Sequence, residues 1–250
     1  MKNRRRDDAG VSQEPHLGGP RQDHGEKDPP EERPDEAADG AFLGDEPALQ
    51  WTRDSLDPSL SYGQYVQARL RQSSALAQWL TAAGCALVAG PAAIVVTFFE
   101  FLAMGRAPVV DLTGIFMVSV LGPVVEEVAK IICVLWLVER RPWLLPGRWA
   151  IPAVGLVGGL SFGAIENLLY THVYTPDAGE ALAAYRWAVT FPAHGLWSLI
   201  AAFGVVRMWR QVFDHGRPAD VSAAFPWIAA AIILHALYNT GALAFDFIAR

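Results

Sequence analysis

The sequence predicts an all-α, polytopic membrane protein with about five transmembrane helices behind a disordered N-terminal tail. Residues 1–58 are rich in charged residues, proline and glycine, so this segment has too little apolar surface to offset its ordering entropy. From residue 76 onward Ala, Leu, Val, Ile, Phe and Trp dominate, in stretches long enough to cross about 30 Å of hydrocarbon. We therefore divide the chain into a charged cytoplasmic tail, residues 1–60, and a transmembrane helical domain, residues 61–250.

The apolar stretches define the predicted helices in order. The transmembrane segments are residues 78–104, 112–138, 150–174, 186–209 and 226–248. A short amphipathic stretch, residues 62–78, precedes them and is expected to lie along the membrane surface. In the second and fourth segments, Pro123 and Pro192 each remove a backbone donor and should open the helix beside a polar residue. The third segment has glycines at four-residue spacing, which should let another helix approach closely; they are Gly155, Gly159 and Gly163.

Arginines in the short loops predict the orientation of these segments. They precede the first segment, separate the second from the third, and follow the fourth. These residues are Arg69, Arg71, Arg140, Arg141, Arg148, Arg207, Arg210 and Arg217. Because loops rich in Lys and Arg stay in the cytoplasm, we expect a multi-pass protein of the cell inner membrane with a cytoplasmic N-terminus.

Four of the five segments carry polar side chains near their midpoints. These residues are Glu126, Glu127 and Lys130 in the second segment, Glu166 and Asn167 in the third, His194 and Ser198 in the fourth, and His235 and Asn239 in the fifth. A charge at the bilayer centre costs roughly 2.5–3.5 kcal/mol, so such groups need a compensating use. At a rise of about 1.5 Å per residue, all lie within roughly 8 Å of the midplane of their own segment. This matched depth predicts one shared cavity.

The residue types in this set favour the activation of water. A carboxylate in a secluded, partly hydrated pocket can act as a general base. We expect Glu127, helped by Glu126, to be that base, and Lys130 to keep one of the two glutamates ionised. A simpler interpretation is that Glu126 and Lys130, four residues apart, only neutralise each other, but it leaves Glu127 unexplained.

Two arrangements of the other groups are open. His194 and His235 could polarise a carbonyl and hold an oxyanion. Alternatively, Glu166, His194 and His235 could bind a metal ion such as zinc. In both arrangements four residues complete the catalytic site, as metal ligands or as oxyanion and orientation groups: Glu166, His194, His235 and Asn239.

The polar residues fall into four short motifs. In chain order these are Glu126-Glu127-Val128-Ala129-Lys130, Phe162-Gly163-Ala164-Ile165-Glu166-Asn167, His194-Gly195-Leu196-Trp197-Ser198 and His235-Ala236-Leu237-Tyr238-Asn239. Together they resemble the Glu-Glu-x-x-Lys, Phe-x-x-x-Glu-Asn and two histidine motifs of the PrsW family of membrane proteases. That family belongs to a larger group that includes the CAAX prenyl proteases and bacteriocin-processing enzymes.

The resemblance implies proteolysis inside the membrane, including cleavage of membrane-bound anti-sigma factors, by enzymes often described as metalloproteases. It implies a membrane-anchored protein substrate and the lipid bilayer as partners, and we expect no nucleic acid.

Three other interpretations compete with this one. Midplane carboxylates and histidines also form proton relays, so the chain could be a proton- or ion-coupled carrier, although the sequence shows no internal duplication. It could also be a non-catalytic scaffold that sequesters a membrane partner. Finally, residues 159–163 fit Gly-x-Ser-x-Gly and could pair Ser161 with His235 in a serine protease, but that motif requires a strand-turn-helix context.

The chain has two cysteines, Cys85 in the first segment and Cys133 in the second. Both lie within the predicted hydrocarbon region, where a structural disulfide is not expected, and two thiols alone do not make a zinc site. We expect them to be small apolar packing residues.

Overall fold

The computed structural model describes residues 60–104, 111–177 and 179–249, so the predicted tail lies outside the described residues apart from Leu60. Within these ranges the chain is helical and has no strand. The α-helices are α3 (Tyr62–Gln72), α4 (Ala75–Met104), α5 (Leu112–Phe116), α6 (Gly122–Arg140), α7 (Ala150–Leu169), α8 (Gly179–Tyr185), α9 (Phe191–His215) and α10 (Phe225–Ala249). The π-helical segments are η1 (Met117–Leu121), η3 (Tyr170–Tyr174) and η4 (Arg186–Thr190), and the 3₁₀ turns are η2 (Pro142–Leu144) and η5 (Val221–Ala223).

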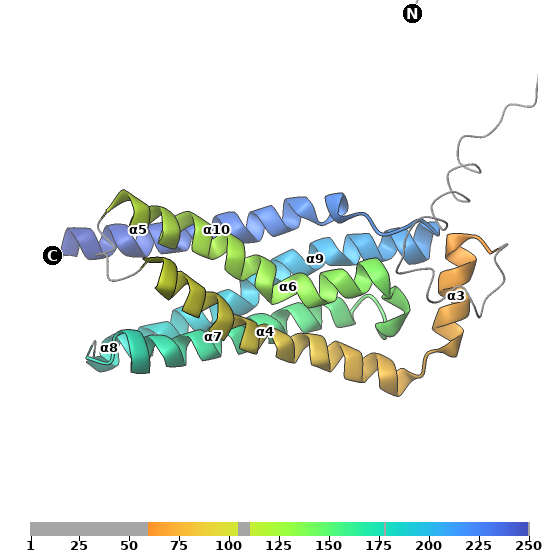
Figure 1. Cartoon of the computed structure of the whole chain (residues 1–250), viewed down its shortest axis with the longest axis horizontal. Helices are drawn as coiled ribbons and strands as arrows, with labels where there is room; N and C mark the ends of the chain where they lie inside the picture. The colour runs from red at the N-terminus through yellow and green to blue at the C-terminus, as the bar shows by residue number, and fades with distance from the viewer. Residues whose placement is uncertain (1–59, 105–110, 178, 250) are drawn as a thin grey trace, which may run out of the picture.

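The long helices run side by side along one axis, and α3 crosses one end of the bundle (Figure 1). The all-α, multi-pass prediction is therefore confirmed. Four segments of the described chain are long and apolar enough to cross a membrane: Ala75–Val96, Ala150–Tyr174, Gly179–His215 and Phe225–Phe245. The other predicted span, residues 112–138, is helical throughout as α5, η1 and α6, and its charged residues face the other helices rather than lipid.

Helix α3 packs on the end of the bundle. It begins at Ser61, whose hydroxyl accepts from the backbone of Gln64 while the Gln64 side chain accepts from the backbone of Ser61, a capping box. Its buried residues contact the turn after α6 and the end of α9; this cluster is Tyr62, Tyr65, Val66, Trp143 and Val212. The predicted surface helix is thus shorter than expected, because the chain breaks at Ser73 before α4 starts.

The glycines of α7 bring it against α9, as predicted. A Cβ at Gly159 would clash with the His194 carbonyl oxygen, and one at Gly155 would lie 2.9 Å from the Ser198 carbonyl oxygen. A Cβ at Gly163 would lie 3.1 Å from the His194 side chain. Any larger residue at the first two positions would push the helices apart, so the glycines fix the place of His194.

Both predicted helix openings coincide with π-helical segments. Pro123 follows η1 and Pro192 follows η4, each in the first turn of the next α-helix. Because proline has no N–H, the preceding turn loses a hydrogen bond and can widen. The carbonyl of Val118 in η1 instead accepts a hydrogen bond from the Asn239 side chain of α10, at 3.0 Å. Backbone loosened within the bundle is therefore satisfied by a neighbouring helix.

Candidate active site

Five predicted site residues meet in one buried group, which we call the central cluster. Helix α6 supplies Glu126, Glu127 and Lys130, α9 supplies His194, and α10 supplies His235. In the same order, their exposed fractions are 5%, 0%, 3%, 1% and 2%. Burying so many ionisable groups is costly unless they are paired with one another. The structure pairs them closely, as the matched depth of their helices predicts.

Lys130 lies between the other charged groups. Its Nζ is 2.6 Å from Glu127 Oε1, 3.5 Å from Glu126 Oε2 and 2.7 Å from His194 Nδ1. It also lies 4.5 Å from the centre of the Phe162 ring, a cation–π distance. The ammonium is therefore shared by two carboxylates that would otherwise repel each other, which is the role that the sequence predicts for it.

His235 is held by Glu127. Its Nδ1 is 2.8 Å from Glu127 Oε1, and because a carboxylate only accepts, the Nδ1–H donates. The ring stacks on Trp197 of α9, with centroids 4.1 Å apart and planes 16° from parallel. This leaves the Nε2 lone pair directed toward the cluster, 3.9 Å from Glu126 Oε2.

His194 also has a carboxylate beside one of its ring nitrogens, that of Glu166. Its Nδ1 faces the Lys130 ammonium, which only donates, so the ring proton belongs on Nε2. That nitrogen lies 2.7 Å from Glu166 Oε2 of α7, a close approach that is not well aligned for a hydrogen bond. Each histidine thus has one nitrogen against a carboxylate and the other facing the cluster.

Glu166 is anchored by a residue that the sequence reasoning missed. Arg186 of η4 places Nη2 3.0 Å from Glu166 Oε1, and its guanidinium lies 3.8 Å from the centre of the Tyr170 ring. Asn167 donates to the backbone carbonyl of Arg186 at 3.0 Å. Arg186 is the first residue of the predicted segment 186–209, and an arginine at the edge of an apolar stretch is a signal for a buried partner.

A hydrogen bond ties Asn239 to η1, away from the charged groups of the central cluster. Its side chain donates to Val118 of η1, and the neighbouring Tyr238 hydroxyl is 2.7 Å from the hydroxyl of Thr190 in η4. These contacts lie within one turn of His235. They tie α10 to η1 and to η4.

One group of residues has the donors and spacing of a metal site. The ligand atoms of Glu126, His194 and His235 lie within 4.8 Å of one another, and Glu126 Oε2 is 3.9 Å from a nitrogen of each histidine. Two imidazoles and one carboxylate form a donor set suited to zinc. A carboxylate on the far nitrogen of each histidine also fixes its tautomer as in many zinc sites. The residues therefore fit a metal ion, although Lys130 competes for His194 Nδ1.

The structure groups Glu126 with the two histidines, whereas the sequence proposed Glu166 in that position. Glu166 lies behind His194, on the nitrogen that points away from the cluster. In the described residues, the candidate metal group contains Glu126 and not Glu166. Spacing along the chain could not distinguish the two carboxylates, because both occur near the middle of their segments.

The Gly-x-Ser-x-Gly stretch lies in the middle of α7 and has no strand before it. Ser161 faces α4, because a Cβ added to Gly90 would lie 2.5 Å from its hydroxyl. The structure therefore gives Ser161 no nucleophile elbow.

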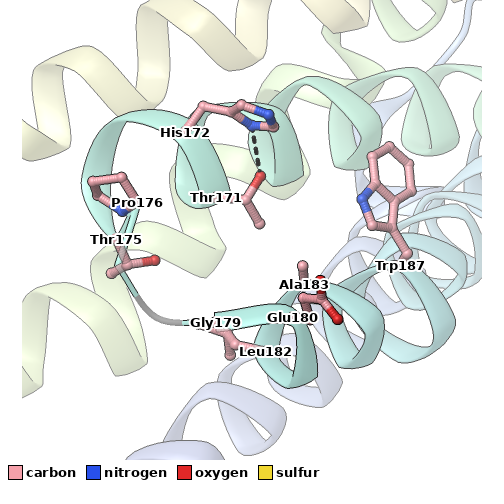
Figure 2. Close-up of a pocket in the computed structure, with 9 residues that line it drawn as sticks. All are labelled: Thr171, His172, Thr175, Pro176, Gly179, Glu180, Leu182, Ala183 and Trp187. Atoms are coloured by element: carbon pink, nitrogen blue, oxygen red, sulfur yellow. Dashed lines mark hydrogen bonds between the residues drawn. The ribbon is translucent and has the colours of Figure 1, made fainter.

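A separate cavity of about 320 Å³ opens between η3 and α8 (Figure 2). It is lined by Thr171, His172, Thr175, Pro176, Gly179, Glu180, Leu182, Ala183 and Trp187. The Thr171 hydroxyl is 2.9 Å from His172 Nδ1, so two of the lining side chains are hydrogen-bonded to each other. None of the lining residues belongs to the central cluster.

Comparison with known proteins supports the motif resemblance. A family model described as PrsW family intramembrane metalloprotease matches residues 74–249. This range contains the whole helical bundle from α4 onward, with every residue of the central cluster. Neither a search of curated proteins nor a search of solved structures found a match.

Proposed function

The chain belongs to the PrsW family of intramembrane metalloproteases, and we propose that it cleaves a membrane-bound protein, such as an anti-sigma factor, with a glutamate-activated water. Family membership makes it a membrane-embedded peptidase; the substrate and the mechanism are our proposals. The observation that carries the mechanism is the central cluster, in which two carboxylates, one ammonium and two imidazoles from three helices are buried together. We further propose the cell inner membrane as its location, with the N-terminus cytoplasmic.

Glu127 is the proposed base. Its Oε1 is occupied by Lys130 and His235, which hold the carboxylate ionised and fixed in place. Its Oε2 is buried and has no hydrogen-bond partner among the described residues, so it can accept a proton from water. Glu126, His194 and His235 would hold zinc, which would polarise a peptide carbonyl as a Lewis acid. Glu166 and Asn239 orient the two histidines.

The test of this function is a comparison of membrane-protein termini in host cells. One strain carries the wild-type chain and the other carries Glu126→Gln/Glu127→Gln at equal abundance. New termini that occur only with the wild type would support proteolysis and identify the substrate. Identical termini under both resting and envelope-stress conditions would contradict it and favour the carrier or the scaffold.

We expect the purified protein to bind about one zinc ion per chain and to lose affinity when the cluster is altered. Glu126→Gln removes a ligand, and Glu166→Gln removes the carboxylate behind His194, which should lower zinc affinity by about 10–100-fold. Glu139→Gln, on the same helix as Glu126 but partly exposed and paired with Arg140, is the matched control. The measurement is bound zinc at controlled free zinc. Unchanged affinity in Glu126→Gln would argue for a metal-free mechanism.

A further inference from the structure

The chain's two cysteines lie against each other across a helix interface. Cys85 of α4 and Cys133 of α6 have their Sγ atoms 2.7 Å apart, and both are free thiols. A disulfide bond is about 2.05 Å long, so the sulfurs need to approach by less than about 1 Å to form one. From the sequence we expected two separate packing residues and no structural disulfide, and a separation of 48 positions does not indicate that the two thiols meet.

The surrounding core keeps the two thiols together. Cys85 belongs to the same buried cluster as Ala82 and Ala86 of its own helix and Ile131 and Val134 of α6. These side chains hold α4 and α6 in contact on both sides of the sulfur pair. Helix packing therefore holds the two thiols close together in the reduced protein.

We propose that Cys85 and Cys133 form an oxidation site that a peroxide converts to an intramolecular disulfide. Cys133 is half-buried and Cys85 is buried, so Cys133 meets the oxidant first. Its sulfur attacks one peroxide oxygen, the O–O bond breaks, and water leaves as the sulfenic acid forms. Cys85 then attacks that sulfur, the S–O bond breaks, and a second water leaves. Hydrogen peroxide is reduced to two waters while two thiols are oxidised to one disulfide.

The bond would act on the helix that carries the proposed base. Cys133 is three residues after Lys130 and seven after Glu126, so it lies two turns from Glu126 on the same face of α6. A disulfide would pull this turn of α6 toward α4. That movement shifts Lys130, which lies 3.5 Å from Glu126 and 2.6 Å from Glu127. A misplacement of about 1 Å can cost about 10²-fold in rate. This step rests on the proposed function, and it assigns the disulfide an inhibitory role that a reductant reverses.

The first experiment measures the bond itself, without any assay of cleavage. The full chain in lipid nanodiscs is treated with hydrogen peroxide, and free thiols and cross-linked peptides are measured by mass spectrometry. We expect both thiols to be lost together, with one peptide pair joined through Cys85 and Cys133, at least about tenfold faster than in the denatured chain. Cys85→Ala and Cys133→Ala should give no such pair. Two free thiols remaining, or equal rates in the native and denatured chains, would overturn the proposal.

The second experiment separates the disulfide's effect from the proposed function. Cleavage by the oxidised wild type should fall at least about tenfold and return on reduction, whereas Cys85→Ala/Cys133→Ala should be insensitive to peroxide. A disulfide that forms without changing cleavage would overturn the inhibitory role alone. Absence of cleavage by the reduced wild type would contradict the proposed function and leave the thiol result standing.

Discussion

Glu127→Gln should lower the rate of substrate cleavage by about 10²–10⁴-fold, the range that a positioned general base contributes. Glutamine has nearly the same shape and can still accept from Lys130 and His235 through its oxygen. It lacks the second carboxylate oxygen, which is the buried atom that has no hydrogen-bond partner among the described residues and is our proposed proton acceptor. The measurement is the turnover of the substrate identified by its new terminus, using purified protein in lipid.

The same assay distinguishes the two adjacent glutamates. Glu139→Gln keeps the helix and changes a partly exposed carboxylate, so it should retain the wild-type rate. Glu126→Gln should also be impaired, but through its contact with Lys130 and its proximity to both histidines. Full activity of Glu127→Gln together with an inactive Glu126→Gln would transfer the role of base to Glu126.

The positions of the polar residues could be predicted from the sequence because a membrane imposes a simple constraint. Each ionisable residue in an apolar segment must face protein, and equal depth on separate helices brings such residues together. This reasoning predicted the meeting of Glu127, Lys130, His194 and His235. It also predicted that another helix would approach the glycines of α7, because glycines at four-residue spacing leave room for a helix backbone; the structure shows that this helix is α9.

The assignment of partners could not be predicted, because it depends on how each helix is rotated about its axis. That rotation places Glu126 rather than Glu166 beside both histidines, and Asn239 beside η1 rather than in the cluster. Likewise, Arg186 reaches Glu166 because η4 packs beside α7, which the sequence does not show. The prolines indicated where the helices would open, but not what would fill the openings.

Lys130→Met should destabilise the protein by about 3–5 kcal/mol, the cost of leaving a buried charge without its partner. The ammonium is fully buried and is the nearest cation to both Glu126 and Glu127 among the described residues. Methionine fills a similar volume but neutralises neither carboxylate. The measurement is the unfolding midpoint of the purified protein in detergent. Arg140→Met changes a partly exposed arginine paired with Glu139, and it should shift stability by less than about 1 kcal/mol.

A double variant shows whether the loss comes from charge or from packing. Lys130→Met/Glu127→Gln removes the ammonium and one carboxylate together, so it should be more stable than Lys130→Met alone. Recovery should be partial, since Glu126 stays buried beside the two histidines. The opposite result is that the double variant loses as much stability as the two single variants added together. Lys130 would then stabilise the bundle through its contact with Phe162 rather than by neutralising the glutamates. In that case Glu127 would not need the Lys130 ammonium to stay ionised. The proposal that Lys130 keeps the base ionised would then be wrong.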